Sequence, residues 1–489
     1  MKKIMLLGGV LLLVLGALTP VMAQDDEPPA PRTLVWLAGG RPGQPAGPGT
    51  LAWVKAGSEP VEIAPVPDEG PGTRVLVCGQ EAVFAAEEQA AVMLFIGAER
   101  GGLYRLTLDD APALTRLADA HALACVGPDR AMFSADGNRW AFIEYPMDVT
   151  RRGPYATGRL HVLAMPEGEP AAAVVEDVAA FGLDAGGVYT VQLFPNALGL
   201  ADEVVLTYWG ETGMREMLAM MPADGCDWTS AALDVHEASG QVALSLGEHC
   251  PGGSQWRLFT VEGNADPVEH VYMPSGGAFL PASTINQVHY LPEGDQLLAV
   301  FPNGRAANIG NLVLVDLTAN TVTLVTEGVT VDLFPDGRAR HLRYSPGGNY
   351  LAYVSSTANN EHFLHRLALD GGFMPDTISA GPRGDAVTTF TWRPDDALVY
   401  VAGGVNGLNN ALYVLPAGEE TPQRVIRGKF VLDVGQASPT AVTLLNHRAP
   451  DDDFPDPTAD LVQVGFDGLQ QVLLDGRESG LVAYPLLVR

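Results

Sequence analysis

Short apolar runs alternate with turn residues along almost the whole chain. Around residue 345 the order is Ser345-Pro346-Gly347-Gly348, then the apolar run Tyr350–Ser355, then a second apolar run that ends at Leu369. Short runs of this kind, bounded by Gly, Pro and Asp, predict β-strands joined by tight hairpin turns. We therefore expect a chain made almost entirely of strands and turns.

The same plan recurs about every 50 residues, which is the period of a repeat architecture. The clearest recurring strand, expected as the second of each unit, is found nine times: Thr33–Leu37, Ala91–Ile96, Trp140–Tyr145, Glu203–Tyr208, Gln241–Leu246, Gln296–Phe301, Tyr350–Ser355, Ala397–Ala402 and Ala441–Asn446. A third strand follows in most units: Arg159–Ala164, Trp256–Val261, Asn311–Leu317, Phe363–Leu369, Ala411–Leu415 and Asp460–Phe466. A constant period of short strands predicts a β-propeller and not an ordinary β-sandwich.

The expected fold class is therefore all-β, a single β-propeller over residues 33–489. Eight blades are expected, with seven or nine left open, because residues 182–272 are irregular and could contain a fused or incomplete unit. The first unit supplies three evident strands, and residues 481–488 form a strand that belongs to no unit. Since a terminal strand that completes the first blade removes an exposed edge, we expect the C-terminal strand to close the ring there.

The N-terminus has the pattern of a secretory signal. Lys2 and Lys3 precede the apolar stretch 4–18, and Val21-Met22-Ala23 is a small-residue cleavage site. Residues 1–23 are thus a predicted signal peptide, cleaved after Ala23, and the polar, Pro-rich residues 24–32 a mobile lead-in. We expect a secreted, periplasmic or cell-envelope protein with no transmembrane segment after cleavage.

The chain is strongly acidic, with 58 Asp and Glu against 29 Lys and Arg, and a net charge of −29. Because such a surface repels phosphate backbones, nucleic acid is not an expected partner. The four cysteines, in an exported chain, predict two structural disulfides. The economical pairing is Cys78 with Cys125 and Cys226 with Cys250.

Two segments share a motif that resembles a known repeat type. Residues 133–143 and 344–355 resemble the Phe-Ser-Pro-Asp-Gly-x-x-Leu-Ala-Phe-x-Ser motif of TolB-like (WD40-like, PD40) β-propeller repeats, and 290–299 and 392–400 are looser copies. The resemblance implies a propeller of this repeat type and not one particular protein. No Gly-x-Ser-x-Gly nucleophile motif occurs, so a peptidase of the related prolyl-oligopeptidase type is not expected.

The densest acidic segment, residues 451–460, supplies the candidate metal ligands. Carboxylate oxygens are the ligands that Ca²⁺ prefers, although the spacing does not match an EF-hand loop and a solvated loop is the alternative. The candidates are Asp451, Asp452, Asp453, Asp456 and Asp460. No catalytic residue and no other cofactor is predicted.

Other candidates are single residues or pairs. His362 and His365 are three residues apart, so on a strand they point to opposite faces and do not bind one ion. Arg151 and Arg152 form a small cationic site within the insertion 147–158, where a long rim loop suggests recognition. Three aromatic residues near loops are candidate contacts, with packing inside the blades as the alternative: Tyr145, Tyr155 and Trp209.

These observations predict an exported, non-enzymatic β-propeller that binds a protein or a glycan, or serves as a scaffold, as a monomer. The alternative is a propeller hydrolase of the lactonase or glycosidase type, with an acidic, cation-binding central channel. A propeller supports either function, so the fold does not decide between them.

Overall fold

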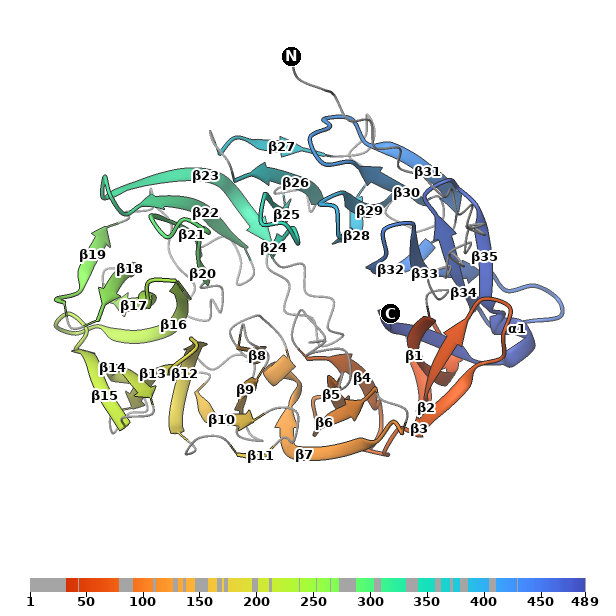
Figure 1. Cartoon of the computed structure of the whole chain (residues 1–489), viewed down its shortest axis with the longest axis horizontal. Helices are drawn as coiled ribbons and strands as arrows, with labels where there is room; N and C mark the ends of the chain where they lie inside the picture. The colour runs from red at the N-terminus through yellow and green to blue at the C-terminus, as the bar shows by residue number, and fades with distance from the viewer. Residues whose placement is uncertain are drawn as a thin grey trace, which may run out of the picture.

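The computed structural model describes residues 32–488 apart from internal gaps, of which the longest are 79–90, 146–156, 272–286, 331–341 and 379–385. The signal sequence and residues 24–31 of the lead-in lie outside the described residues, as do Arg151, Arg152 and Tyr155. Nearly every described element is a strand, and the strands follow one another around a ring (Figure 1).

The described strands pair as antiparallel groups of four, which we number units 1 to 9. Unit 1 comprises β36 (Val482–Val488), β1 (Arg32–Arg41), β2 (Gln44–Lys55) and β3 (Val61–Pro65). Unit 2 comprises β4 (Arg74–Val77), β5 (Ala91–Gly97), β6 (Arg100–Thr107) and β7 (Leu114–His121). Unit 3 comprises β8 (Ala131–Phe133), β9 (Arg139–Glu144), β10 (Gly158–Ala164) and β11 (Glu169–Pro170). Units 4 to 6 comprise β12 (Val175–Leu183), β13 (Gly187–Pro195), β14 (Ala201–Gly210) and β15 (Gly213–Met220); β16 (Asp227–His236), β17 (Gln241–Cys250), β18 (Gly253–Glu262) and β19 (Val268–Val271); and β20 (Gln287–Tyr290), β21 (Gln296–Pro302), β22 (Ile309–Asp316) and β23 (Thr321–Thr330).

Units 7 to 9 comprise β24 (Arg343–Tyr344), β25 (Tyr350–Ser356), β26 (His362–Ala368) and β27 (Pro375–Thr377); β28 (Ala386–Trp392), β29 (Leu398–Gly403), β30 (Asn410–Leu415) and β31 (Gln423–Gly428); and β32 (Phe430–Ala437), β33 (Ala441–Arg448), β34 (Thr458–Gly465) and β35 (Gln470–Leu474). Two short helical turns lie between units, η1 (Ala122–Cys125) and α1 (Gly476–Ser479). A few cross-unit pairings, such as Val329 with Ser355, join neighbouring units into larger sheets.

The hydrophobic core is divided in the same way as the strands. Nine clusters of buried apolar side chains each contain residues of two neighbouring units, and together they pass around the whole ring. Between units 6 and 7, for example, Leu298 and Leu312 pack with Leu351 and Tyr353. Each inner strand is covered on both faces, which explains the continuous apolar runs in the sequence. The described part of the molecule is therefore a β-propeller.

The strand pairing favours nine units, the upper of the three counts that the sequence left open. Eight of the nine recurring runs are second strands, as expected. The exception is the run 203–208, which lies in β14, the third strand of unit 4. The second strand of that unit is β13, and the irregular region 182–272 contains the greater part of two complete units. The expectation of eight blades assumed one fused unit there.

The C-terminal strand lies beside the first strand of the chain. β36 pairs antiparallel with β1 over Thr33–Ala38 and so becomes the inner strand of unit 1. Its Val482 and Ala483 are buried in the cluster that joins units 9 and 1, and Tyr484 stacks on Trp36 with ring centroids 4.9 Å apart. The strand therefore lies where the sequence analysis expected it.

The motif shared by residues 133–143 and 344–355 lies between the first and second strands of a unit. Residues 344–355 contain a turn there, whereas residues 135–137 of the other copy lie outside the described residues. The amide of Ser345 donates to the carbonyl of Tyr350 at 2.8 Å, and the amide of Ser134 donates to the carbonyl of Arg139 at 2.9 Å. The hydroxyl of each serine also accepts the amide of the same partner. Gly348 has a φ of 71°, which a residue without a side chain adopts at little cost. The motif is therefore a hairpin device.

Both predicted disulfides are present. Cys78 is bonded to Cys125, and Cys226 to Cys250, and the described residues contain no free cysteine. The first joins the end of β4 to η1, and the second joins the start of β16 to the end of β17. Two disulfides are compatible with an extracytoplasmic location.

Candidate functional site

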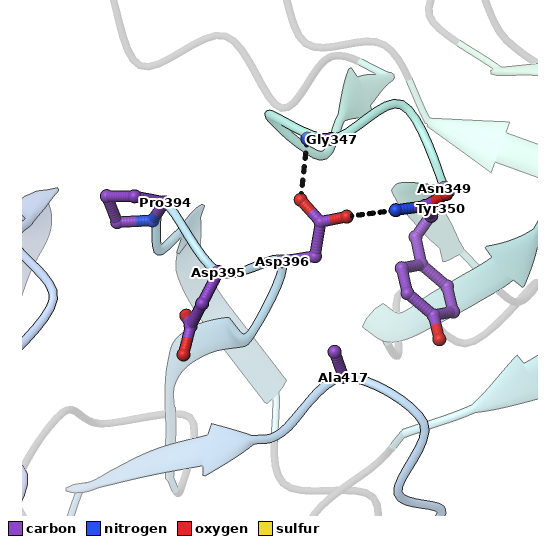
Figure 2. Close-up of a pocket in the computed structure, with 7 residues that line it drawn as sticks. All are labelled: Gly347, Asn349, Tyr350, Pro394, Asp395, Asp396 and Ala417. Carbon is purple, nitrogen blue, oxygen red and sulfur yellow. Dashed lines mark hydrogen bonds between the residues drawn. The ribbon is translucent and has the colours of Figure 1, made fainter. Parts of the chain in front are cut away.

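Two cavities lie between neighbouring units. The first, of about 390 Å³, is formed by the turns that connect the first and second strands of units 7 and 8 (Figure 2). Its lining includes two carboxylates, those of Asp395 and Asp396, and the ring of Tyr350. Two carboxylates in one cavity are the usual sign of acid–base chemistry, so their bonding decides what this cavity does.

Both carboxylates already have partners. Asp396 accepts the amide of Gly347 and the side-chain amide of Asn349, each at 2.7 Å, as Figure 2 shows. Asp395 is exposed and pairs with Arg393 at 2.6 Å. Asp396 is only 5% exposed, so its carboxylate ties the turn of unit 8 to the turn of unit 7. The first cavity is thus bordered by a structural connection between units.

A second connection reinforces the same side. The buried guanidinium of Arg366 in unit 7 donates to the carbonyls of Pro416 and Glu419 in unit 8 and lies 4.9 Å from the centroid of the Tyr350 ring. The Tyr350 hydroxyl accepts the amide of Gly418 at 3.0 Å. Similar bonds join other units: Arg139 donates to the carbonyl of Gly187, and His236 bonds the carbonyl of Pro292. These contacts have a structural role around the ring.

The second cavity, of about 460 Å³, lies between the outer strand of unit 8 and unit 9. We call it the arginine pocket. Its lining contains three arginines and no acidic side chain: Arg427, Gly428, Asn446, His447, Arg448, Ala449, Gln470 and Arg477. The end of β31 supplies Arg427, the end of β33 supplies Arg448, and α1 supplies Arg477. Three guanidinium groups in one cavity are notable on a molecule with a net charge of −29.

Aspartates behind the pocket hold two of these arginines in place. Arg448 pairs with Asp460 at 2.5 Å and with Asp475 at 3.2 Å, while Arg477 pairs with Asp451 at 2.7 Å. Burial would lower the pKa of Arg448, but the two aspartates raise it above its usual range. The Arg477 guanidinium also lies 4.9 Å from the Phe454 ring and donates to the carbonyl of Ala449. Both side chains are therefore fixed before any ligand arrives.

Arg427 differs from the other two. It is exposed, and it has no ion-pair or hydrogen-bond partner among the residues that the structure describes. It comes from β31 of unit 8, whereas Arg448 comes from β33 of unit 9 and Arg477 from α1. The pocket thus combines two immobilised guanidinium groups with one that is available.

The acidic segment predicted as a metal site forms part of this arrangement. Asp451 and Asp460 pair with the pocket arginines, and Asp456 pairs with Arg41 of unit 1 at 2.5 Å. Asp451 also accepts the amides of Asp453 and Phe454, and these amides together with Arg477 lower the pKa of its carboxyl. Asp452 and Asp453 are exposed. The Ca²⁺ site over these five residues remains a prediction, and three of its five carboxylates have arginine partners.

In the described part of the chain, one group of three residues has potential metal-ligand atoms that all lie within 4.8 Å of one another: Cys226, Glu248 and Cys250. Both cysteines are in a disulfide, so their sulfurs are not thiolates. Glu248 is fully buried and accepts the amide of Ala223 and the side-chain amide of Gln255. This group stabilises the loop before β16.

The remaining sequence candidates have structural positions. His365 is buried and bonds the hydroxyls of Ser355 at 2.6 Å and Thr377 at 3.2 Å; burial lowers its pKa to about 4. Tyr145 is 1% exposed, within the cluster between units 3 and 4, where Trp209 is partly buried. Tyr145 is therefore part of the core packing, and Trp209 packs against the same cluster while part of its surface stays exposed.

Sequence reasoning missed the arginine pocket. Its lining residues span positions 427 to 477, and no motif connects them. The one local signal is that Arg448 directly precedes the acidic segment and Arg477 follows Asp475. Arginines next to aspartates around a loop indicate ion pairs that fix the side chains. The third arginine of the pocket, Arg427, comes from unit 8 and gives no such local signal.

Comparisons with known proteins show similarity of structure without a family. No protein-family model matches the sequence, and no curated protein has a significant match. Among solved structures, a prolyl endopeptidase is similar at 12% identity and a TM-score of 0.44, over 80% of this chain and 54% of the peptidase. Dipeptidyl peptidase 4 of Porphyromonas gingivalis has 12% identity and a TM-score of 0.48, over 84% of this chain and 60% of its own. The chain thus spans little more than half the length of either peptidase.

TolB of Acinetobacter baumannii is also among the similar structures, at 12% identity and a TM-score of 0.26, over 73% of this chain and 82% of TolB. Identities and TM-scores at this level support no functional argument. The class defined by the described residues is the β-propeller, and its assignment depends on the strand pairing and the nine inter-unit clusters. Among the described helices, none is long and apolar enough to cross a membrane.

Proposed function

We propose that the protein is an exported, non-enzymatic β-propeller that binds a glycan in the arginine pocket. The observation that carries the proposal is the composition of the pocket wall. Except for Gly428 and Ala449, every lining residue offers a hydrogen-bonding side chain. Amide, imidazole and guanidinium groups match the hydroxyl-rich surface of a saccharide, because each sugar hydroxyl both donates and accepts hydrogen bonds.

The same composition favours a glycan over a protein partner. The centre of a protein–protein interface is enriched in aromatic and apolar anchors that fill desolvated pockets. Among the described residues, those that line the arginine pocket include no Phe, Tyr or Trp and no large aliphatic side chain. A volume of about 460 Å³ is within the usual range for sites that bind a small ligand.

Binding without catalysis is supported by the state of the nearby carboxylates. Glycoside hydrolysis uses a pair of carboxyl groups that flank the scissile bond, one of them as a proton donor. Around this pocket Asp451, Asp460 and Asp475 pair with arginines, so each of these carboxylates already has a cationic partner. The aspartates position the arginines and do not line the cavity.

Glycan-array screening followed by calorimetry on purified protein tests the proposal. We expect binding to at least one oligosaccharide, weakened at least about tenfold by Asn446→Ala, since a lost polar contact costs about 1–3 kcal/mol. Gln471→Ala, which lies on β35 beside Gln470 but outside the lining, should bind like the wild type. Release of reducing ends from the bound glycan would favour the hydrolase alternative, and the absence of any glycan binding would overturn the proposal.

A further inference from the structure

We propose that the arginine pocket selects saccharides that bear one carboxylate on an otherwise uncharged molecule, and that Arg427 binds this carboxylate. The inference rests on the proposed glycan-binding function and names the ligand class of the same site. It depends on three observations on the described residues: those that line the pocket include no acidic side chain, two of its arginines are immobilised, and the third has no ion-pair or hydrogen-bond partner among them.

The immobilised arginines make the pocket ready for an anion. Arg448 donates its Nε–H to Asp460 and one Nη2–H to Asp475, so further N–H groups of its fork remain for a ligand. Ordering a long arginine side chain at the moment of binding costs conformational entropy. Here that cost is met in the folded protein, because buried Asp460, 2% exposed, already holds the guanidinium.

Arg427 supplies the charge that the fixed pairs do not. Arg448 and Arg477 are compensated by Asp460, Asp475 and Asp451, so their charges attract an approaching anion weakly. The charge of Arg427 has no such counterpart among the described residues. A planar guanidinium accepts a carboxylate through two parallel hydrogen bonds, a geometry that the neutral hydroxymethyl group of an ordinary hexose does not reproduce.

The charge of the whole molecule limits the number of anionic groups. A net charge of −29 repels a ligand with many negative charges, and this repulsion acts over about one Debye length, ~10 Å at 0.1 M salt. A ligand with a single carboxylate gains the short-range contact with Arg427 and is only weakly repelled by the molecule. In a polyuronate, every carboxylate that lies outside the pocket adds to the repulsion.

Calorimetry with a matched pair of ligands tests the inference. The two probes are 4-nitrophenyl β-D-glucuronide and 4-nitrophenyl β-D-glucoside, which differ at C6 alone, and tetragalacturonate is the polyanionic comparison. We expect the glucuronide to bind at least about tenfold more tightly than the glucoside, as one charge-assisted contact allows. Tetragalacturonate should bind more weakly than the glucuronide at low salt and should approach it as salt is raised.

The variant Arg427→Gln should abolish the preference for the glucuronide, because it should lower glucuronide affinity at least about tenfold more than it lowers glucoside affinity. Arg424→Gln is the matched control, since Arg424 lies on the same strand and is exposed but does not line the pocket. Arg427→Lys keeps the charge and loses the fork, so it should restore part of the preference. It also keeps the test valid if the glutamine variant misfolds.

The outcomes separate this inference from the proposed function. Equal affinity of the wild type for glucuronide and glucoside, or a preference that survives in Arg427→Gln, would overturn the selection of a carboxylate while glycan binding stands. Tight binding of free acetate, as strong as that of the glucuronide, would show a general anion site and would also overturn the inference. Failure of every saccharide on the array would overturn the proposed function itself.

Discussion

At the residue scale, the turn of unit 8 departs from the repeat motif at Asp396. In the equivalent turns Gly294 and Gly348 occupy the position with positive φ, at 78° and 71°. Asp396 adopts the same backbone region, with a φ of 61°, although a side chain makes this conformation costly. Its two hydrogen bonds to the turn of unit 7 offset that cost. Asp396 therefore connects two units and is not only a residue of its own turn.

The variant Asp396→Ala should therefore lower the free energy of unfolding by about 2–4 kcal/mol, because it removes two buried hydrogen bonds and keeps the unfavourable φ. Asp396→Gly should cost less, since glycine relieves the backbone and only the hydrogen bonds are lost. Urea denaturation measures both. Asp395→Ala, next in the chain but exposed, should have almost no effect, as an exposed ion pair contributes little. Equal stability of all three variants would contradict this role of Asp396.

At the scale of the element, the sequence located strands better than it assigned them to units. The run 203–208 is a strand, but it is the third of unit 4, because the weaker run 187–195 precedes it and pairs with it. The C-terminal strand was assigned correctly beside β1. A terminal strand that belongs to no repeat has few possible partners, so its position could be predicted. The strand β13 was not recognised in the sequence, so the strand after it was assigned the wrong place in its unit.

Ending the chain at residue 479 should lower the melting temperature markedly. The truncation exposes the edge of β1 and removes buried Val482 and Ala483 from the cluster that joins units 9 and 1. Burial of one aliphatic side chain contributes about 1.5–3 kcal/mol, so several are lost together with the pairing. Differential scanning calorimetry measures the effect, and a synthetic peptide of residues 480–489 should restore part of it. An unchanged melting temperature would argue against β36 as the closing strand.

At the scale of the whole molecule, charge repulsion opposes the compact fold. The excess of acidic over basic residues gives a net charge of −29, and many of the ion pairs on the surface are exposed. Exposed pairs contribute little to stability, while the mutual repulsion of many like charges destabilises a compact state. The local ion pairs around the arginine pocket position side chains and do not balance the charge of the molecule.

We expect sodium chloride to stabilise the protein. Raising its concentration from about 0.01 M to about 0.15 M shortens the Debye length from ~30 Å to ~8 Å and so screens the repulsion between acidic side chains. The melting temperature should rise over this range. A non-ionic solute at equal osmolality separates screening from general solute effects and should give a smaller rise. A melting temperature that falls with salt would show that attractive pairs outweigh the repulsion.

Features that depend on residues close together in the chain could be predicted from the pattern of apolar and turn residues. Each hairpin is encoded within about six residues by a turn motif and the apolar runs on either side, so strands, turns and the approximate period were predictable. The two disulfides join the cysteines in the economical pairing that the sequence analysis expected.

The tertiary structure alone decided the features that bring distant residues together. The described strands form nine groups of four, and each group packs against the next through a shared apolar cluster. The arginine pocket combines the end of β31, the end of β33 and α1. The ion pairs of the acidic segment could not be predicted for the same reason, since its partners Arg41 and Arg477 come from other parts of the chain. Packing between units determines which charges meet, and no local pattern of residues records that packing.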